Sequence, residues 1–268
     1  MSWLLALFDW RSVAVFRRNL EVYLRNWRTA FFPPAMEPVV YFLALGLGLK
    51  GFVGTLDYDG IPLDYATYVA PGLLAYAAFT TPFYESLYSA YVRMFYQKTW
   101  DGILATQVEL EHLVWGEILW AAFRGLLNGT IIALVLTGFT LGGLVDLKLG
   151  LLPIVPLLGF VAGFAFSAFA LVFTAIVPGI DHMNYPVFLI GVPLSLASNT
   201  YFPVSSETPW VQTLIELNPV YQLAESSRAL LVGGDAWPHV GKLFATSLFF
   251  VLVMGFAAMK LTRRRVLT

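Results

Sequence analysis

The sequence predicts an all-α integral membrane protein with six transmembrane helices, and two observations carry this prediction. First, 58% of the residues are hydrophobic and only 12% are charged, whereas soluble domains average about 25% charged residues. Second, the apolar residues come in blocks of roughly 20, the length that a helix needs to cross a hydrocarbon core about 30 Å thick. We therefore expect lipid to surround most of the chain.

The predicted elements form a single transmembrane domain over residues 1–268. Residues 9–29 carry apolar and basic residues at mixed steps of three and four, which is typical of a helix lying in the membrane interface. The alternative is that they form the first turns of the first span. The predicted spans cover residues 31–49, 68–92, 113–141, 151–177, 185–200 and 239–261.

Two of the connecting segments have a recognisable pattern. Residues 50–66 are rich in glycine and aspartate, which indicates an acidic loop with several turns. Residues 201–237 contain two short amphipathic pieces. The first begins at Thr208-Pro209, and the second begins at Asn218-Pro219 and ends at Gly233-Gly234, because proline favours the start of a helix and glycine its end.

The basic residues predict the orientation, since cytoplasmic loops carry an excess of lysine and arginine. With six spans, both termini, residues 93–112 and the turn near Asp181 lie on one side of the membrane. That side holds the N-terminal arginines, Arg93, Lys98, Lys260 and Arg263 to Arg265, whereas the other side keeps Lys50, Lys148, Arg228 and Lys242. We therefore expect both termini to be cytoplasmic, with residues 50–66 and 201–237 facing outward.

The sequence offers no catalytic or nucleotide-binding motif. It has no cysteine, and its three histidines, His112, His182 and His239, lie far apart, so neither a metal site nor a hydrolase site is expected. Gly46 and Gly48 lack the Gly-Lys-Ser/Thr ending that binds phosphate. We expect no cofactor on this chain, and any ATP must be hydrolysed by a partner. The net charge of −1 points to no nucleic-acid partner.

The segment from Arg93 to Gln107 mixes charged residues with Phe95, Tyr96 and Trp100 in a short stretch that can form a helix. Aromatic residues beside charges are typical of a docking surface. The alternative is an interfacial loop whose aromatic side chains rest among lipid headgroups.

Arg124 lies about ten residues into the third span, where an unpaired charge costs several kcal/mol. Its candidate partners are Glu117, Glu85 and Glu37. A structural ion pair between helices and a polar contact with substrate headgroups are both compatible with this position.

The second span carries a stripe of aromatic residues. Tyr84, Tyr88, Tyr91 and Phe95 recur at helical spacing and share one predicted face, and Tyr76 and Phe79 lie earlier in the same span. Such a face can stack against sugar rings, but helix packing and interfacial belts use the same residues. We take Tyr76, Phe79, Tyr84, Tyr88, Tyr91 and Arg124 as candidate residues of a substrate path.

Five motifs in this order resemble a known family. They are Arg93 to Gln107, the Gly116-Glu117-Ile-Leu-Trp-Ala-Ala run, Tyr201-Phe-Pro-Val, Asn218-Pro219-Val-Tyr and the terminal arginines. Together they look like the type-2 ABC exporter permeases, in particular the nodulation-factor (NodJ-like) lipo-oligosaccharide export permeases. The resemblance extends over nearly the whole chain.

The resemblance implies a homodimer in the bacterial inner membrane with two copies of a separate ABC ATPase, which binds ATP and Mg. It implies that residues 93–112 contain the coupling helix that docks into the ATPase, and that the two short outward helices are a re-entrant gate. The expected ATPase contacts are Arg93, Phe95, Tyr96, Lys98, Thr99, Trp100, Asp101 and Ile103.

The expected function is therefore that of a permease subunit, not an enzyme by itself, in an exporter of a lipid-linked oligo- or polysaccharide. Within the same machinery, a drug or another lipid is an alternative cargo. From a different class, an ion-coupled secondary transporter would need intramembrane carboxylates, for which Glu37 and Glu85 are candidates.

Overall fold

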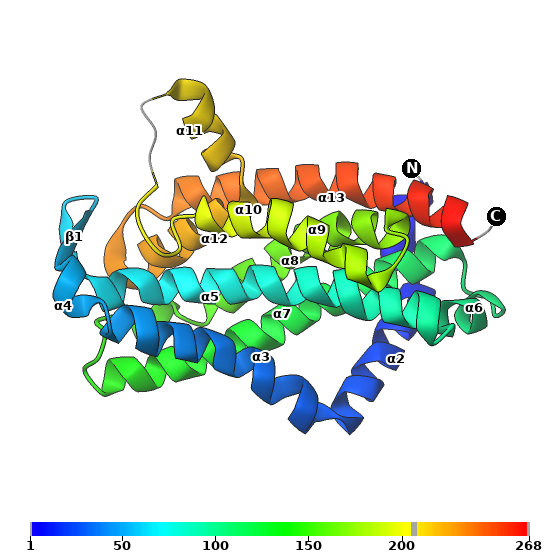
Figure 1. The fold of residues 1–268 in the computed structure, drawn as a ribbon, viewed down its shortest axis with the longest axis horizontal. Coiled ribbons are helices and arrows are strands. Elements are labelled where there is room, and N and C mark those ends of the chain that lie inside the picture. Colours follow the sequence, from blue (N-terminus) through cyan, green and yellow to red (C-terminus); the bar gives the residue numbers. More distant parts are fainter. Residues whose placement is uncertain (1, 205–207, 267–268) are drawn as a thin grey trace.

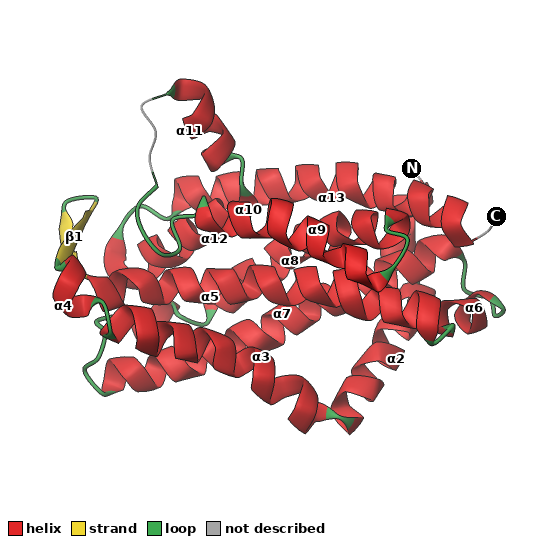
Figure 2. Ribbon diagram, in the orientation of Figure 1, coloured by secondary structure: helices red, strands yellow, loops and turns green. Residues whose placement is uncertain are grey.

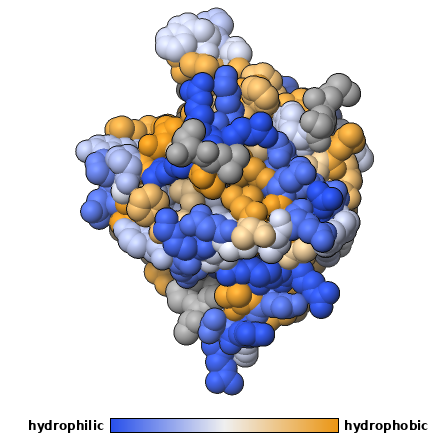
Figure 3. Space-filling model, turned by 90° about the vertical axis from the view of Figure 1, so that its right-hand side faces the viewer, coloured by the Kyte–Doolittle hydropathy of each residue, from blue (hydrophilic) through white to orange (hydrophobic). Residues whose placement is uncertain are grey.

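A computed structural model describes residues 2–204 and 208–266. Its long helices run roughly along one axis (Figure 1). Both termini and the short helix α6 (Thr99–Leu104) lie at one end, and a β-hairpin lies at the other. The end that carries the termini has broad hydrophilic areas with smaller hydrophobic ones between them (Figure 3).

Three helices are long and apolar enough to cross a membrane: α7 (Leu110–Leu141), α8 (Ile154–Ile176) and α13 (Trp237–Val266). With 23 residues, α8 is about 35 Å long, enough for a hydrocarbon core of about 30 Å. Helix dominates the described residues (Figure 2), so the prediction of a helical membrane protein is confirmed. The count of six spans remains a prediction.

The other three predicted spans also fall on helices, but each of these contains π-helical turns. α3 (Trp27–Tyr41) continues through Phe42–Leu47, and α5 (Tyr65–Tyr84) continues through Glu85–Ser89 and Val92–Tyr96. The fifth helix joins α9 (Asn184–Pro186), Val187–Gly191 and α10 (Val192–Leu196). Its length of about 20 Å is less than the thickness of the hydrocarbon core.

Residues 50–66, expected to form only a loop, fold into the short helix α4 (Lys50–Val53) and a hairpin of β1 (Thr55–Tyr58) and β2 (Ile61–Asp64). The turn is Asp59-Gly60, with φ angles of 50° and 79°. An Asp-Gly pair between apolar residues is a strong hairpin signal. The glycine and aspartate content of this segment indicated only a loop, so the expectation of an all-α chain is corrected for residues 55–64.

The N-terminal segment consists of α1 (Ser2–Leu5), a 3₁₀ turn at Ala6–Phe8 and the amphipathic helix α2 (Trp10–Arg25). Asp9 caps α2, and the hydrogen bond from the main-chain N–H of Arg11 lowers the pKa of its carboxyl group. α2 lies obliquely to the bundle (Figure 1). It covers most of the segment 9–29 that was expected in the membrane interface.

α2 packs closely on α7 because residue 116 has no side chain. A Cβ atom added at Gly116 would lie 2.5 Å from the Cβ atom of Val15 and 2.8 Å from the carbonyl oxygen of Ser12. Ser12 also donates a hydrogen bond to the carbonyl oxygen of His112, at 3.1 Å. Small residues at such contacts let two helix backbones approach each other.

The two short helices after the fifth predicted span start where the prolines indicated. α11 (Pro209–Glu216) projects from the bundle (Figure 1) and exposes Trp210. α12 (Pro219–Arg228) continues through a π turn at Ala229–Gly233 and is buried over its whole length against α5, α8 and α13. Short 3₁₀ turns at Leu149–Leu151 and Ile180–Met183 complete the described elements.

We expect Gly116→Ala to destabilise the protein by about 1–3 kcal/mol, because the added methyl group overlaps Val15. The matched control is Gly138→Ala in the same helix, where an added Cβ atom meets nothing within 4 Å. Thermal unfolding of both purified variants measures the difference. Equal melting temperatures would show that α2 does not rest on α7 in this way.

Candidate functional site

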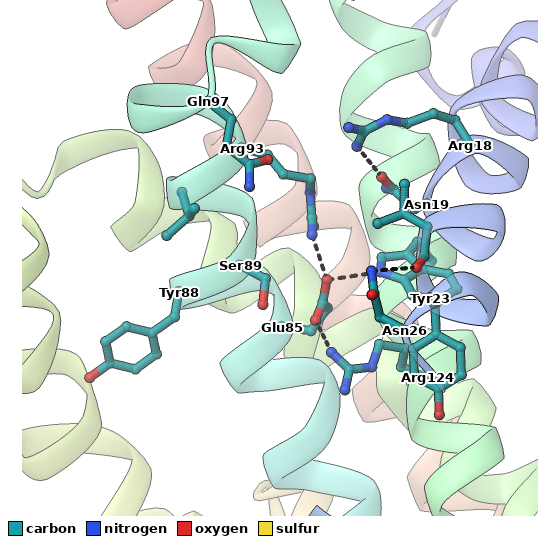
Figure 4. Close-up of a pocket in the computed structure, with 13 residues that line it drawn as sticks. Arg18, Asn19, Tyr23, Asn26, Glu85, Tyr88, Ser89, Arg93, Gln97 and Arg124 are labelled. Atoms are coloured by element: carbon teal, nitrogen blue, oxygen red, sulfur yellow. Dashed lines mark hydrogen bonds and ion pairs between the residues drawn. The ribbon is translucent and has the colours of Figure 1, made fainter. Parts of the chain in front are cut away.

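A cluster of four charged side chains lies inside the bundle near the end that carries the termini. Arg93 Nη1 donates to Glu85 Oε1 at 2.7 Å, and Arg93 Nη2 donates to Glu117 Oε2 at 2.5 Å. Arg124 forms an ion pair with the other oxygen of Glu85. Figure 4 shows both arginines converging on Glu85. We call these four residues the ionic cluster.

Arg124 therefore pairs with Glu85, one of its three candidate partners, whereas Glu117 pairs with Arg93. Glu117 is the candidate that is nearest to Arg124 in the sequence and lies on the same helix, but the two side chains do not form the pair. The cluster joins the continuation of α5 to α7, and both carboxylates are almost completely buried. Removing one member of such a buried pair leaves an uncompensated charge, which costs roughly 3–5 kcal/mol.

Two tryptophans complete the hydrogen bonding of the ionic cluster. Trp120 Nε1 donates to Glu85 Oε1 at 2.8 Å, and Trp100 Nε1 donates to Glu117 Oε1 at 3.1 Å. Trp100 belongs to α6 and is fully buried. A movement of α6 therefore acts directly on Glu117 and, through Arg93, on Glu85.

The eight residues expected to contact an ATPase divide into two groups. Arg93 and Trp100 point into the protein, and Trp100 ties α6 to the bundle through Glu117. Phe95 and Tyr96 are 44% and 61% exposed, and Lys98 and Asp101 are exposed as well, whereas Thr99 and Ile103 are partly buried. We call residues 93–112 the coupling segment, after the role that the resemblance implies. Its outer surface consists of Phe95, Tyr96, Lys98 and Asp101.

This outer surface is held in a defined conformation. Lys98 has a φ angle of 51°, in the left-handed region, and separates the end of the α5 continuation from α6. Its Nζ atom lies 5.4 Å from the centroid of the Phe95 ring and 3.8 Å from Asp101 Oδ2. The guanidinium group of Arg265, from α13, lies 5.3 Å from the same ring. The last helix thus also supports the coupling segment.

The aromatic stripe expected along the second span is divided. Tyr84 and Tyr88 remain neighbours, with ring centroids 6.2 Å apart, and both are partly exposed. Tyr91 is buried and donates to the carbonyl oxygen of Pro178 at 3.2 Å. The π turn at Glu85–Ser89 adds a residue to the helical turn and changes the face on which later residues lie.

Phe79 is also buried, with its ring centroid 4.8 Å from that of Phe166. Neither Phe79 nor Tyr91 lines an open surface of the chain. Tyr76, in contrast, is partly exposed and contacts Tyr41 and Tyr201, with ring centroids 6.2 and 6.0 Å away. We call Tyr41, Tyr76, Tyr84, Tyr88 and Tyr201 the tyrosine face, which is formed by α3, α5 and the segment after α10.

A pocket of about 350 Å³ opens between α2 and the helices of the ionic cluster (Figure 4). Local sequence patterns do not indicate that Arg18 and Asn19 of α2 line one pocket with Arg93 and Arg124, because this depends on how α2 packs. Among the described residues, no group of acidic or histidine side chains is placed to hold a metal ion. We call this cavity the arginine pocket; its walls include Arg18, Asn19, Tyr23, Tyr88, Arg93 and Arg124.

A second buried ion pair lies in α12. Arg228, expected on the outward side of the membrane, is fully buried in the protein and pairs with Glu225. Its Nε atom donates to the carbonyl oxygen of Tyr68 at 3.2 Å, and its Nη2 atom donates to that of Asn199 at 2.5 Å. The guanidinium carbon lies 3.9 Å from the centroid of the Tyr68 ring. This pair ties α12 to α5 and to the turn after α10.

Comparison with known proteins agrees with this architecture. The sequence profile of the ABC-2 type transporter family matches residues 12–232. Nodulation protein J of Sinorhizobium fredii (strain NBRC 101917 / NGR234) is 33% identical over 250 residues, which cover 91% of this chain and 92% of the relative. Nodulation protein J of Rhizobium meliloti (strain 1021) is 29% identical over 258 residues, covering 96% and 95%.

A more distant relative is the inner membrane transport permease YadH of Escherichia coli (strain K12), which is 22% identical over 241 residues, or 89% of each chain. The family match covers most of the chain and includes the ionic cluster, the coupling segment and α12. It confirms the resemblance that the sequence motifs indicated. The chain belongs to the ABC-2 type transporter family, a family of membrane-spanning transport components.

Proposed function

We propose that this chain is the permease subunit of an ATP-driven exporter that moves a lipid-linked oligo- or polysaccharide out of the cytoplasm across a bacterial inner membrane. In this proposal two permeases form a homodimer and two copies of a separate ABC ATPase bind ATP and Mg. Family membership and the names of the relatives, Nodulation protein J and inner membrane transport permease, support it. The observation that carries it is the attachment of the coupling segment to the ionic cluster.

The coupling segment has the two properties that a transmission element needs. Its outer surface offers exposed aromatic and charged groups to a partner, as docking sites do. Its inner side is fixed to Glu117 through Trp100 and to Glu85, near the end of the second predicted span, through Arg93. A push from an ATPase on Phe95 and Tyr96 would therefore move two helices together, because breaking the buried pairs is costly.

The substrate path in this proposal follows the tyrosine face between two permeases. Tyrosine rings can stack on sugars and their hydroxyl groups can form hydrogen bonds with them. Phe79 and Tyr91 are left out of the path because both are buried in the core of the chain. Arg124 contributes through its pair with Glu85 and through its place in the wall of the arginine pocket.

The orientation can be tested with single cysteines, because the natural chain has none. We expect a membrane-impermeant maleimide to label Asp59→Cys, in the hairpin turn, in intact spheroplasts. Asp101→Cys, in α6, should be labelled only after the membrane is permeabilised. The hairpin and α6 lie at opposite ends of the molecule (Figure 1). The reverse pattern would place the coupling segment outside the cell and overturn the proposal.

The main experiment measures ATPase binding and transport together. We expect the double substitution Phe95→Ala and Tyr96→Ala to weaken the Kd of the purified ATPase for the permease by roughly 30-fold, since truncation of interface hot spots costs about 2 kcal/mol or more. ATP-driven uptake of a labelled lipid-linked saccharide into inverted vesicles should fall with it. Phe52→Ala is the matched control, since Phe52 is 89% exposed at the opposite end.

Unchanged binding and transport in the double variant would count against the coupling role. Transport of a lipid without a saccharide, or of a drug, at the same rate would keep the exporter but reject the proposed cargo. Uptake that continues without ATP or an ATPase would favour a secondary transporter.

A second prediction concerns the inner side of the coupling segment. Glu117→Gln keeps the shape of the side chain but leaves Arg93 with a single carboxylate partner. We expect ATPase binding to be retained while ATP-driven transport falls roughly fivefold or more, the effect of about 1 kcal/mol. Glu21→Gln, an exposed change in α2, is the control. Parallel loss of binding and transport would show that Glu117 supports the docking surface rather than transmission.

A further inference from the structure

The arginine pocket contains more positive charge than the two carboxylates of the ionic cluster can neutralise. Glu85 and Glu117 together neutralise Arg93 and Arg124. Arg18 lines the same pocket, and its Nη1 atom donates to the amide oxygen of Asn19 at 2.8 Å. The nearby carboxylate of Glu117 already accepts from Arg93 and Trp100, so it compensates the charge of Arg18 only in part.

The pocket also holds an unused hydrogen-bond donor. Asn19 is 4% exposed, and its amide nitrogen Nδ2 has no hydrogen-bond partner among the described residues. A buried donor without a partner costs about 1–3 kcal/mol. Burial and the nearby charge of Arg93 lower the pKa of Arg18. An acceptor that carries negative charge would satisfy both Asn19 and Arg18.

The negative charge of Glu85 does not exclude an anion from the pocket. One of its carboxylate oxygens accepts from Arg93 and Trp120, and the other pairs with Arg124. Arg18, which lines the same pocket, carries a planar guanidinium group, and this group matches phosphate geometry especially well. The volume of about 350 Å³ leaves room for a headgroup.

The position of the pocket indicates how the ligand is attached. One wall is α2, the amphipathic helix expected in the membrane interface, where lipid headgroups lie. Another wall contains Tyr88, which also belongs to the tyrosine face. A phosphate group in the pocket would therefore place its hydrophobic part toward lipid and any attached sugar toward the tyrosine face.

We propose that the arginine pocket binds the phosphate group of an anionic amphiphile, with Arg18 and Asn19 as its dedicated ligands. The proposal rests on the proposed function for the cytoplasmic placement of α2. The phosphate can belong to a membrane phospholipid or to the lipid anchor of the cargo, and both present the same chemistry to the pocket.

Native mass spectrometry of the full-length chain in detergent tests this directly, with palmitoyl-oleoyl phosphatidic acid and phosphatidylcholine as the probes. We expect phosphatidic acid to bind at one saturable site more tightly than phosphatidylcholine. Arg18→Gln should weaken its Kd about tenfold, which corresponds to about 1.4 kcal/mol, and Arg18→Lys should weaken it less. Arg17→Gln is the matched control, because Arg17 is the adjacent residue and its side chain is 77% exposed.

Inorganic pyrophosphate serves as a second probe. Displacement of phosphatidic acid by pyrophosphate would support recognition of the phosphate group alone, whereas Arg18-dependent binding without displacement would support a membrane-anchored phosphate. Equal affinity for the two lipids, or equal losses in Arg17→Gln and Arg18→Gln at unchanged melting temperature, would overturn the proposal. Because neither the ATPase nor transport enters the assay, its failure can be told apart from failure of the proposed function.

Discussion

The buried pairing of Glu85 and Glu117 with Arg93 and Arg124 is the interaction on which the described arrangement depends. In a low-dielectric interior, separated charges are far more costly than paired ones, so these four side chains fix how α5 and α7 lie against each other. Trp120 and Trp100 satisfy the remaining acceptor positions. Because Trp100 comes from α6, a segment at the end of the molecule becomes part of the interior network.

The coupling segment has an exposed side and a buried side. Phe95 and Tyr96 are exposed, and the Phe95 ring stacks on the ring of the buried Tyr91, with centroids 5.4 Å apart. Trp100 and Arg93 bind the buried carboxylates and hold the segment in place. The support of Arg265 from α13 adds a third helix to the same connection.

A second buried ion pair holds helices together toward the opposite end of the molecule. Arg228 and Glu225 hold the buried helix α12 against α5 through Tyr68 and Asn199. α12 is short, yet it carries several polar side chains in the interior, each with hydrogen bonds to backbone or side-chain partners. The tyrosine face extends between these two ionic anchors, so both of its ends are bordered by fixed charge pairs.

The sequence by itself determined the features that depend on local composition: a helical membrane protein, the long apolar helices α7, α8 and α13, the helix starts at Pro209 and Pro219, and the family. Tertiary packing decided what local patterns cannot encode. It paired Glu117 with Arg93 instead of Arg124, buried Trp100 and Arg228, and divided the tyrosine stripe at π turns. It also brought Arg18 near Arg93, in the wall of one pocket. Hydropathy and periodicity act over a few residues, whereas the partner of a buried charge depends on which helices meet.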